Sequence, residues 1–269
     1  MTANDHHFLN VDGVHLECRW AIPAQTRPDC PVLVLLHEGL GCVAAWKAWP
    51  DELAEASGCR VFVYSRAGYG ASDPVSLPRP IRYMHHEGHA VLPRVLDVAG
   101  IDDAVLVGHS DGGSIAIIMA GGEQDSRVRG LVLLAAHVFN EQICVDAIRQ
   151  AAVAYEQGGL REGLRKYHGD NVDVAFRGWN QAWLHPDFWH WNLEEYLPGI
   201  GVPALIMQGR QDQYGTAAQV EAIAGQVAGP TTVCWLDDCG HAPHREAPVQ
   251  SIDAIKAFVN SLTEAGNGA

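Results

Sequence analysis

The chain has 269 residues, 48% of them hydrophobic, and a formal net charge of −14 that comes from 32 acidic and 18 basic residues. This length and hydrophobic content fit one large α/β domain with an insertion, and the acidic balance argues against nucleic acid or an anionic membrane as a partner. The N-terminus has no basic start followed by an apolar run, and no apolar stretch reaches membrane length. We therefore expect a cytoplasmic protein, monomeric or homodimeric, whose partner is a small-molecule substrate.

The seven cysteines are odd in number and scattered, most of them in apolar, strand-like surroundings. Small domains that are held together by disulfides carry an even number of cysteines in a recognisable framework. The sequence therefore predicts no disulfide framework and favours a reducing compartment.

Asp12 and Gly13 separate two alternating segments, which predicts an antiparallel hairpin formed by residues 8–11 and 14–21. Beyond it, apolar runs of strand length alternate with helical segments, as expected when helices cover both faces of a parallel sheet. The further predicted strands are residues 31–37, 60–64, 104–109, 128–136, 202–208 and 231–236. The predicted helices of this part are residues 46–56, 81–98, 114–120, 216–227 and 252–262.

The stretch between residues 137 and 200 differs from the rest, because it has no apolar strand. Glu141 to Tyr155 is amphipathic, and the part that follows is aromatic and polar, with four tryptophans close together, Trp179, Trp183, Trp189 and Trp191. We interpret residues 137–200 as an inserted helical cap, and residues 1–136 and 201–269 as one core domain. The core is predicted to hold a mostly parallel, eight-stranded sheet covered by helices on both faces.

The run from Val105 to Gly113, Val-Leu-Val-Gly-His-Ser-Asp-Gly-Gly, indicates a buried strand that ends in a Gly-x-Ser-x-Gly turn and leads directly into a helix. Gly108 and Gly112 leave room for a sharp, strained turn, and a nucleophile elbow requires this context. Ser110 is therefore the candidate nucleophile. A serine hydroxyl is a weak nucleophile near neutral pH, so it needs a base and a carboxylate that orients the base.

Candidates for both partners follow the serine in the sequence, each in a loop directly beyond a predicted strand. Asp212 lies in the loop after residues 202–208, and His241 lies in the loop after residues 231–236. The carboxyl ends of parallel strands meet at one edge of a sheet, so we expect Ser110, Asp212 and His241 to come together at this edge.

The chain resembles the α/β-hydrolase superfamily, in particular its capped esterases, lyases and epoxide hydrolases. The resemblance covers nearly the whole length and rests on Leu-Leu-His-Glu-Gly-Leu-Gly (35–41), Arg-Ala-Gly-Tyr-Gly-Ala-Ser-Asp (66–73), Gly-His-Ser-Asp-Gly-Gly (108–113), Gln-Gly-Arg-Gln-Asp (208–212) and Asp-Cys-Gly-His-Ala-Pro (238–243). It implies the α/β-hydrolase fold, with Ser110 as nucleophile, His241 as general base and then acid, and Asp212 as orienting carboxylate. In this superfamily an aspartate nucleophile accompanies epoxide or halide chemistry, so the serine favours acyl transfer to water.

The oxyanion that develops in such a reaction needs hydrogen-bond donors, and backbone N–H groups at a helix start supply them. The N–H of Asp111, the residue after the nucleophile, is the first expected donor. The resemblance places the second donor in the loop after His37, where Glu38 replaces the usual glycine of the family. An ungapped match makes Gly39 the donor, and an insertion at Glu38 gives this role to Leu40.

Several side chains near this site have two interpretations. Glu38 either forms an ordinary ion pair with an arginine such as Arg66 or contacts a polar group of the substrate under the cap. The helix dipole alone explains Asp111. However, Ser-Asp-Gly-Gly also resembles enzymes of the valacyclovir hydrolase type, in which an acidic residue beside the nucleophile favours substrates with an amino group. Trp179 and Trp183 either pack the cap or contact the substrate.

No metal site and no cofactor are expected. His85 and His89 lack the His-Glu-x-x-His pattern, and a zinc site at Cys239, His241 and His244 would consume the proposed base. The sequence also lacks a glycine-rich phosphate loop.

These features predict a serine hydrolase that cleaves a carboxylic ester of a small, apolar or aromatic substrate through an acyl-enzyme. A carbon–carbon bond (diketone) hydrolase and a thioesterase remain alternatives with the same three residues. A ligand-binding receptor on the hydrolase fold is the alternative from a different functional class.

Overall fold

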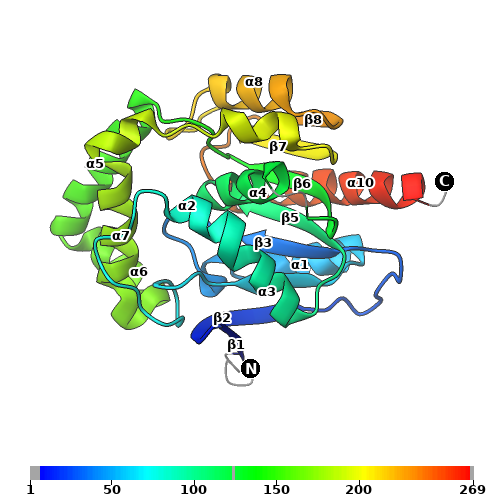
Figure 1. The fold of residues 1–269 in the computed structure, drawn as a ribbon, viewed down its shortest axis with the longest axis horizontal. Helices are drawn as coiled ribbons and strands as arrows, with labels where there is room; N and C mark the ends of the chain where they lie inside the picture. The colour runs from blue at the N-terminus through cyan, green and yellow to red at the C-terminus, as the bar shows by residue number, and fades with distance from the viewer. Residues whose placement is uncertain (1–6, 123–124, 267–269) are drawn as a thin grey trace.

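The computed structural model describes residues 7–122 and 125–266. In this part of the chain, one eight-stranded sheet has the order β1-β2-β4-β3-β5-β6-β7-β8 (Figure 1). The β1–β2 and β2–β4 pairs are antiparallel and the other neighbours are parallel, which confirms the predicted mostly parallel sheet. The strands are β1 (His7–Val11), β2 (Val14–Ala21), β3 (Val32–Leu36), β4 (Val61–Tyr64), β5 (Ala104–His109), β6 (Val128–Leu134), β7 (Ala204–Gly209) and β8 (Thr231–Leu236).

The predicted N-terminal hairpin is confirmed, with Val11 paired to Val14 across the turn. Asp12 and Gly13 have φ angles of 51° and 89°. A two-residue turn whose central residues both have positive φ matches the right-handed twist of the two strands, and Asp-Gly is one of the few pairs that adopt it readily.

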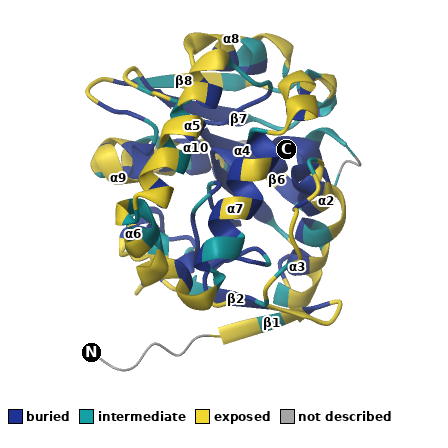
Figure 2. Ribbon diagram, turned by 90° about the vertical axis from the view of Figure 1, so that its left-hand side faces the viewer, coloured by how far each residue is buried: buried dark blue, intermediate teal, exposed yellow. Residues whose placement is uncertain are grey.

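Helices cover both faces of the sheet, and successive residues of the central strands face opposite sides. In β5, Leu106 belongs to one hydrophobic core, whereas Val105 and Val107 belong to the other. The first core includes residues of α3 (Leu92–Ala99), α4 (Asp111–Gly121) and α8 (Ala217–Gln226), and the second includes residues of α1 (Trp49–Ser57) and α10 (Pro248–Gly266). The buried strands and the exposed outer helix faces are visible in Figure 2.

Two predicted helices are interrupted in the structure. The helix predicted over residues 46–56 is a 3-10 helix (η1, Val43–Trp46) followed by α1, because Lys47 has a φ of 54°. The helix predicted over residues 81–98 consists of α2 (Tyr83–His86), a π-helical turn (η2, Glu87–Val91) and α3. Pro93 explains the π turn, since in regular α-helix its ring would clash with the carbonyl four residues earlier.

Residues 137–200 contain helices and one isolated β-bridge, between Phe139 and Asn192. The longer helices, α5, α6 and α7, stand together beyond one end of the sheet (Figure 1). The bridge joins the beginning and the later part of this segment. The helices of the 137–200 segment are α5 (Gln142–Glu156), α6 (Gly159–His168), η3 (Gly169–Asn171), α7 (Val172–Trp183), η4 (Pro186–His190) and η5 (Glu194–Gly199).

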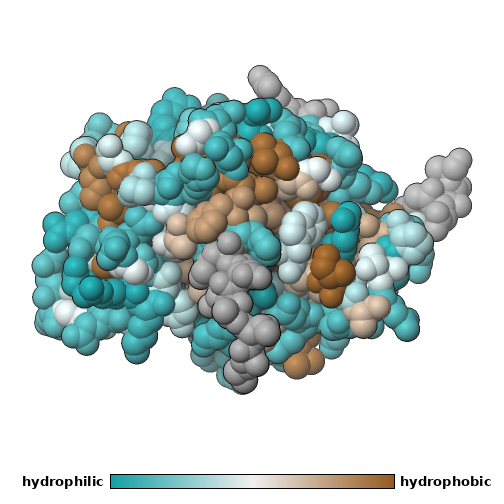
Figure 3. Space-filling model, turned by 90° about the horizontal axis from the view of Figure 1, so that it is seen from below, coloured by the Kyte–Doolittle hydropathy of each residue, from teal (hydrophilic) through white to brown (hydrophobic). Residues whose placement is uncertain are grey.

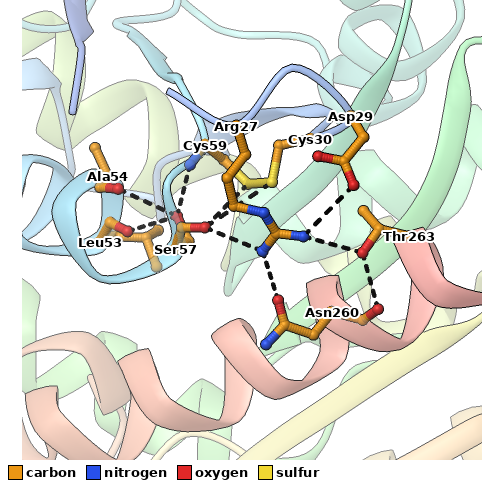
Figure 4. Close-up of a disulfide and its surroundings, with 9 residues drawn as sticks. All are labelled: Arg27, Asp29, Cys30, Leu53, Ala54, Ser57, Cys59, Asn260 and Thr263. Carbon is orange, nitrogen blue, oxygen red and sulfur yellow. Dashed lines mark hydrogen bonds and ion pairs between the residues drawn. A yellow bond between two sulfur atoms is a disulfide. The ribbon is translucent and has the colours of Figure 1, made fainter. Parts of the chain in front are cut away.

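Cys30 and Cys59 form a disulfide, with their Cα atoms 5.3 Å apart (Figure 4). The prediction of no disulfide framework did not include this single pair, and the other five cysteines are free. Each bonded cysteine precedes one of the neighbouring parallel strands β3 and β4, and spacing along the sequence does not reveal which strands are neighbours. Beside the disulfide, Arg27 donates hydrogen bonds to Asn260 (2.6 Å) and Thr263 (3.1 Å) of α10. Disulfides are rare in reducing compartments, so this pair does not support the reducing compartment that the sequence favoured. A cytoplasmic location stays a prediction.

The face shown in Figure 3 is mostly hydrophilic, with apolar side chains gathered near its centre. Among the described residues, no helix combines the length and the apolar character that crossing a membrane requires. The remaining helix, α9 (Pro243–Glu246), is a single turn that lies between β8 and α10 in the sequence.

Candidate active site

Ser110 stands at the tip of a sharp turn between β5 and α4, so the predicted strand, turn and helix are all present. Its backbone angles, φ 52° and ψ −117°, are strained for a residue that has a side chain. The turn has this shape because two glycines permit close backbone contacts. A Cβ atom at Gly108 would collide with the backbone of Gly112, and one at Gly112 would collide with the carbonyl of Leu36.

Asp212 and His241 are brought together at the same edge of the sheet, directly beyond β7 and β8. The Nδ1 atom of His241 lies 2.8 Å and 2.9 Å from the two carboxylate oxygens of Asp212. Asp212 also accepts hydrogen bonds from the Gln208 side chain and from the Tyr214 N–H, each 2.7 Å long. Burial raises the pKa of Asp212, but the bonds from His241 and Tyr214 outweigh it and leave this pKa below the ordinary value.

The ionised carboxylate fixes the protonation of His241. Because Asp212 accepts from Nδ1, this nitrogen carries the proton, and Nε2 is free to accept one. Burial lowers the pKa of His241 to about 4, although Asp212 opposes this shift. The imidazole is therefore neutral at neutral pH, which is the state that a general base requires.

Ser110 and His241 line one cavity of about 380 Å³, together with Gly39, Asp111, Trp179 and other residues. This volume lies within the range of small-molecule sites. Residues of the core and of the 137–200 segment both contribute to the wall of this cavity. A larger cavity, of about 620 Å³, is lined mainly by apolar side chains and contains none of the predicted site residues.

All three residues considered as oxyanion donors line the smaller cavity, namely Gly39, Leu40 and Asp111. Within the described chain, none of their N–H groups donates to a backbone carbonyl. The structure therefore leaves each of these groups available for a ligand. Gly39 stays the predicted second donor, with Leu40 as its alternative.

Arg66 braces the loop that carries two of these donors. Its guanidinium donates to the carbonyls of His37 (2.5 Å) and Glu38 (2.9 Å). The Nε2 atom of His37 in turn accepts from the backbone N–H of Arg66 at 3.1 Å. The side chain of Arg66 is almost completely buried, so these bonds are shielded from water. Arg66 begins the motif at residues 66–73, but this pattern does not reveal that its side chain binds the loop after His37.

The Glu38 carboxylate lies against a histidine rather than Arg66, which contacts only the Glu38 backbone carbonyl, and this contact is an ion pair only when the histidine ring carries both protons. The Oε2 atom lies 3.4 Å from Nδ1 of His109, and Nε2 of His109 donates to the carbonyl of His241 at 2.6 Å. Burial raises the pKa of Glu38, but the contact with His109 outweighs it and holds this pKa well below the ordinary value. The suggested ion pair with Arg66 is therefore wrong. His109 thus connects the elbow to the loop of the predicted base.

The Asp111 carboxylate is buried and makes a contact that could not be predicted from neighbouring residues in the chain. The Tyr83 hydroxyl donates to Oδ2, and the indole N–H of Trp183 donates to the Tyr83 oxygen at 3.1 Å. The other oxygen, Oδ1, is buried and has no partner among the described residues. Burial raises the pKa of Asp111, and the nearby charge of Arg66 opposes this shift. Of the two predicted substrate-binding tryptophans, Trp183 therefore already uses its N–H in the protein.

His168, at the end of α6, fastens the 137–200 segment to the loops beside the cavity. Its Nδ1 atom accepts from the Gly70 N–H at 3.0 Å, and its Nε2 donates to the Leu40 carbonyl at 3.0 Å. Both bonds exist only for the neutral ring with its proton on Nε2. Burial lowers the pKa of His168, in agreement with this state.

The other histidines considered in the sequence pack against aromatic rings. His85 and His89 contact the ring of Tyr196, 5.9 Å and 5.6 Å from centroid to centroid. His244 packs against Trp46 at 4.5 Å and lines the cavity.

Comparison with known proteins agrees with the fold. Residues 33–254 match the model of the alpha/beta hydrolase family. A curated relative from Azorhizobium caulinodans, a protein named carbamate hydrolase RutD, is 36% identical over 102 residues. This alignment covers 38% of the chain and only 36% of the relative.

Solved structures of low sequence identity share the fold. Proline iminopeptidase of Mycobacterium smegmatis is 16% identical, with a TM-score of 0.77, over 97% of this chain and 100% of that one. The esterase EaEST of Exiguobacterium antarcticum is 20% identical, with a TM-score of 0.74, over 95% of this chain and 99% of that one. At these identities the likeness shows the fold alone.

The state of His168 predicts how stability depends on pH. The pKa of this histidine is lower in the folded protein than the value of about 6.5 expected for the unfolded chain. Its contribution to stability is therefore present above about pH 6.5 and is lost as the pH falls. In His168→Gln, the amide oxygen can accept from Gly70 and the amide nitrogen can donate to Leu40, without titrating.

We expect the free energy of unfolding to fall less steeply with decreasing pH in His168→Gln than in the wild type, by up to about 1.4 kcal/mol per pH unit. Urea denaturation at several values between pH 7.5 and pH 5 measures the two slopes. Equal slopes would contradict the assignment of the neutral ring.

Proposed function

This chain belongs to the α/β hydrolase family, and we propose that it hydrolyses a carboxylic ester of a small, apolar or aromatic substrate through an acyl-enzyme on Ser110. The observation that carries the proposal is the Asp212–His241 pair, 2.8 Å apart, whose histidine lines the same cavity as Ser110 in its strained turn. A serine, a neutral imidazole and a carboxylate that orients it are the groups that nucleophilic acyl transfer requires.

In the first half of the reaction, Ser110 Oγ attacks the carbonyl carbon of the ester while Nε2 of His241 takes the hydroxyl proton. The carbonyl oxygen receives the electron pair of its π bond and becomes an oxyanion. The N–H groups of Asp111 and Gly39 stabilise this charge. When the tetrahedral intermediate collapses, the C–O bond to the alcohol breaks, and His241 gives its proton to the leaving oxygen.

In the second half, water attacks the acyl carbon and His241 takes one of its protons. The bond to Ser110 then breaks, and His241 returns the proton to Oγ. The products are a carboxylic acid and an alcohol, and the enzyme is regenerated. Asp212 stays ionised throughout and stabilises the imidazolium that forms in each half.

The 137–200 segment acts as a cap in this proposal. It contributes Ile148, Leu160 and Leu164 to the cavity, along with the rings of Trp179 and Trp183. Apolar walls of this kind favour a small apolar or aromatic acyl or alcohol group. A diketone, a thioester or a carbamate would engage the same serine, and a receptor would bind ligand without turnover, so a substrate panel has to include all of these cases.

A second candidate is an ester that carries an amino group. It rests on Asp111, which lines the cavity and whose Oδ1 is buried without a partner among the described residues. Leaving a buried carboxylate oxygen unpaired costs about 1–3 kcal/mol, and an ammonium donor would recover this cost on binding. Arg66 already supplies a positive charge near this carboxylate, which weakens the need for a cationic substrate.

Removal of the nucleophile tests the proposal directly. Ser110→Ala should lower kcat on the order of 10⁶-fold, and Asp212→Asn about 10⁴-fold because it favours the wrong histidine tautomer. Both are measured with short-chain p-nitrophenyl esters. A fluorophosphonate probe should label Ser110 of the folded wild type, as mass spectrometry of its peptides detects. Absence of labelling, together with unchanged turnover in Ser110→Ala, would exclude the mechanism.

The pKa of His241 predicts the acid limb of the pH profile. The base works only when neutral, and its pKa is about 4. We therefore expect kcat/KM to rise with pH around pH 4 and to be flat from about pH 5.5 to neutrality. Short assays check this, with circular dichroism at each pH to show that the protein is folded. An acid limb centred near the ordinary histidine value of about 6.5 would contradict the assignment.

The amino-ester candidate predicts a selectivity that disappears when the Asp111 charge is removed. The wild type should prefer an α-amino ester over its des-amino analogue by at least about tenfold in kcat/KM, roughly 1.4 kcal/mol. Asp111→Asn should bring the two values together, because the amide keeps the shape and loses the charge. Equal kcat/KM values in the wild type would eliminate this candidate and leave the ester proposal intact.

A further inference from the structure

Trp179 of α7 packs its indole directly on the loop that carries the expected oxyanion donors. A Cβ atom at Gly39 would collide with Nε1 and Cδ1 of Trp179. These two atoms form the pyrrole edge of the ring, and the N–H bond points outward from this edge in the plane of the ring. The same Cβ would lie 3.0 Å from Cε2, so Gly39 sits against the face of the ring at its Nε1 end. The Nε1 atom therefore lies beside the Gly39 backbone, at the wall of the cavity that Ser110 also lines.

This N–H group is available for a ligand. Among the described residues, the indole N–H of Trp179 has no hydrogen-bond partner, whereas the N–H of Trp183 donates to Tyr83. Other tryptophans with an unpaired N–H, Trp46, Trp49 and Trp191, do not line this cavity. Trp179 thus combines a place in the cavity wall with an unused donor.

The orientation of the ring is fixed by packing. Trp179 is 6% exposed and makes an edge contact with Phe176, with ring centroids 6.0 Å apart. Phe176 in turn stacks on Tyr155 of α5, with centroids 3.7 Å apart. A donor that the surrounding residues hold in place needs little reorganisation when charge develops in front of it.

The geometry points to the indole N–H of Trp179 as a third donor to the acyl oxygen of the substrate, next to the backbone N–H groups of Gly39 and Asp111. This inference rests on the proposed function. It assigns Trp179 as a catalytic residue that stabilises the oxyanion, in addition to forming an apolar wall. It also explains the glycine at position 39, since any side chain there would displace the indole. The 137–200 segment would then complete the catalytic site as well as cover it.

The test distinguishes the effect of the indole N–H from the effect of the aromatic ring. Trp179→Phe keeps an aromatic side chain and removes the donor, and replacement of Trp179 by 3-benzothienylalanine keeps the bicyclic shape and removes only the N–H. Trp191→Phe is the matched control, because Trp191 belongs to the same segment, is 8% exposed and lies outside the cavity wall. Circular dichroism and thermal unfolding show that each variant is folded.

Two measurements follow on each variant. The first is kcat and KM for a p-nitrophenyl ester, and the second is the inhibition constant of an alkyl boronic acid, whose tetrahedral adduct on Ser110 mimics the oxyanion. Both Trp179 variants should lose on the order of 10²-fold in kcat, the effect of one oxyanion donor. The boronic acid should lose affinity by a similar factor, and Trp191→Phe should stay within about threefold of the wild type, as expected for a site that contributes no transition-state contact.

An unchanged kcat with only a raised KM would reduce Trp179 to an apolar wall and overturn the inference. Wild-type activity in the benzothienylalanine variant would do the same. Failure of the proposed function has a different signature, since the wild type itself would then neither hydrolyse the ester nor form the boronic acid adduct.

Discussion

The close approach of Gly112 to the end of β3 is the constraint on which the rest of the site depends. Because residue 112 has no side chain, α4 can begin against the Leu36 carbonyl, and Ser110 is forced into its left-handed conformation. Such strain costs about 1–3 kcal/mol and persists only when the surrounding structure determines it. The loop that starts at His37 follows Leu36 directly. The same contact therefore sets both the shape of the elbow and the distance between the nucleophile and the oxyanion loop.

Buried polar side chains hold the loops around this point by binding their backbone carbonyls. Arg66 holds the carbonyls of residues 37 and 38, His109 holds that of His241, and His168 holds that of Leu40. Loops at a sheet edge are otherwise the most mobile part of such a fold. Each bond is shielded by burial, and an unpaired carbonyl in its place would cost about 1–3 kcal/mol. The buried polar side chains near the site therefore position two separate loops, the one after His37 and the one that carries His241.

Most of the fold could be predicted from the sequence because periodicity and turn chemistry act locally. The hairpin at Asp12, the buried strands and the helix after Ser110 all follow from neighbouring residues. Partners that depend on which elements become neighbours could not be predicted. The Cys30–Cys59 disulfide requires β3 and β4 to be adjacent, and the hydrogen bond from Tyr83 to Asp111 joins two helices that the sequence does not relate.

The same limit applies to the candidate site. The chain order of Ser110, Asp212 and His241 places them at one sheet edge by topology alone, so the sequence was sufficient for them. For Glu38, an arginine or a group of the substrate was conceivable, and only the fold shows that His109, at the end of β5, lies beside it instead. Trp179 and Trp183 have the same two interpretations in the sequence. In the structure, Trp183 donates its N–H to the Tyr83 oxygen, whereas the N–H of Trp179 is unused. The unpaired oxygen of Asp111 is buried and costs energy in the free protein, and a hydrogen-bond donor of the substrate would recover this cost on binding. The unused N–H of Trp179 offers a hydrogen bond to a substrate acceptor.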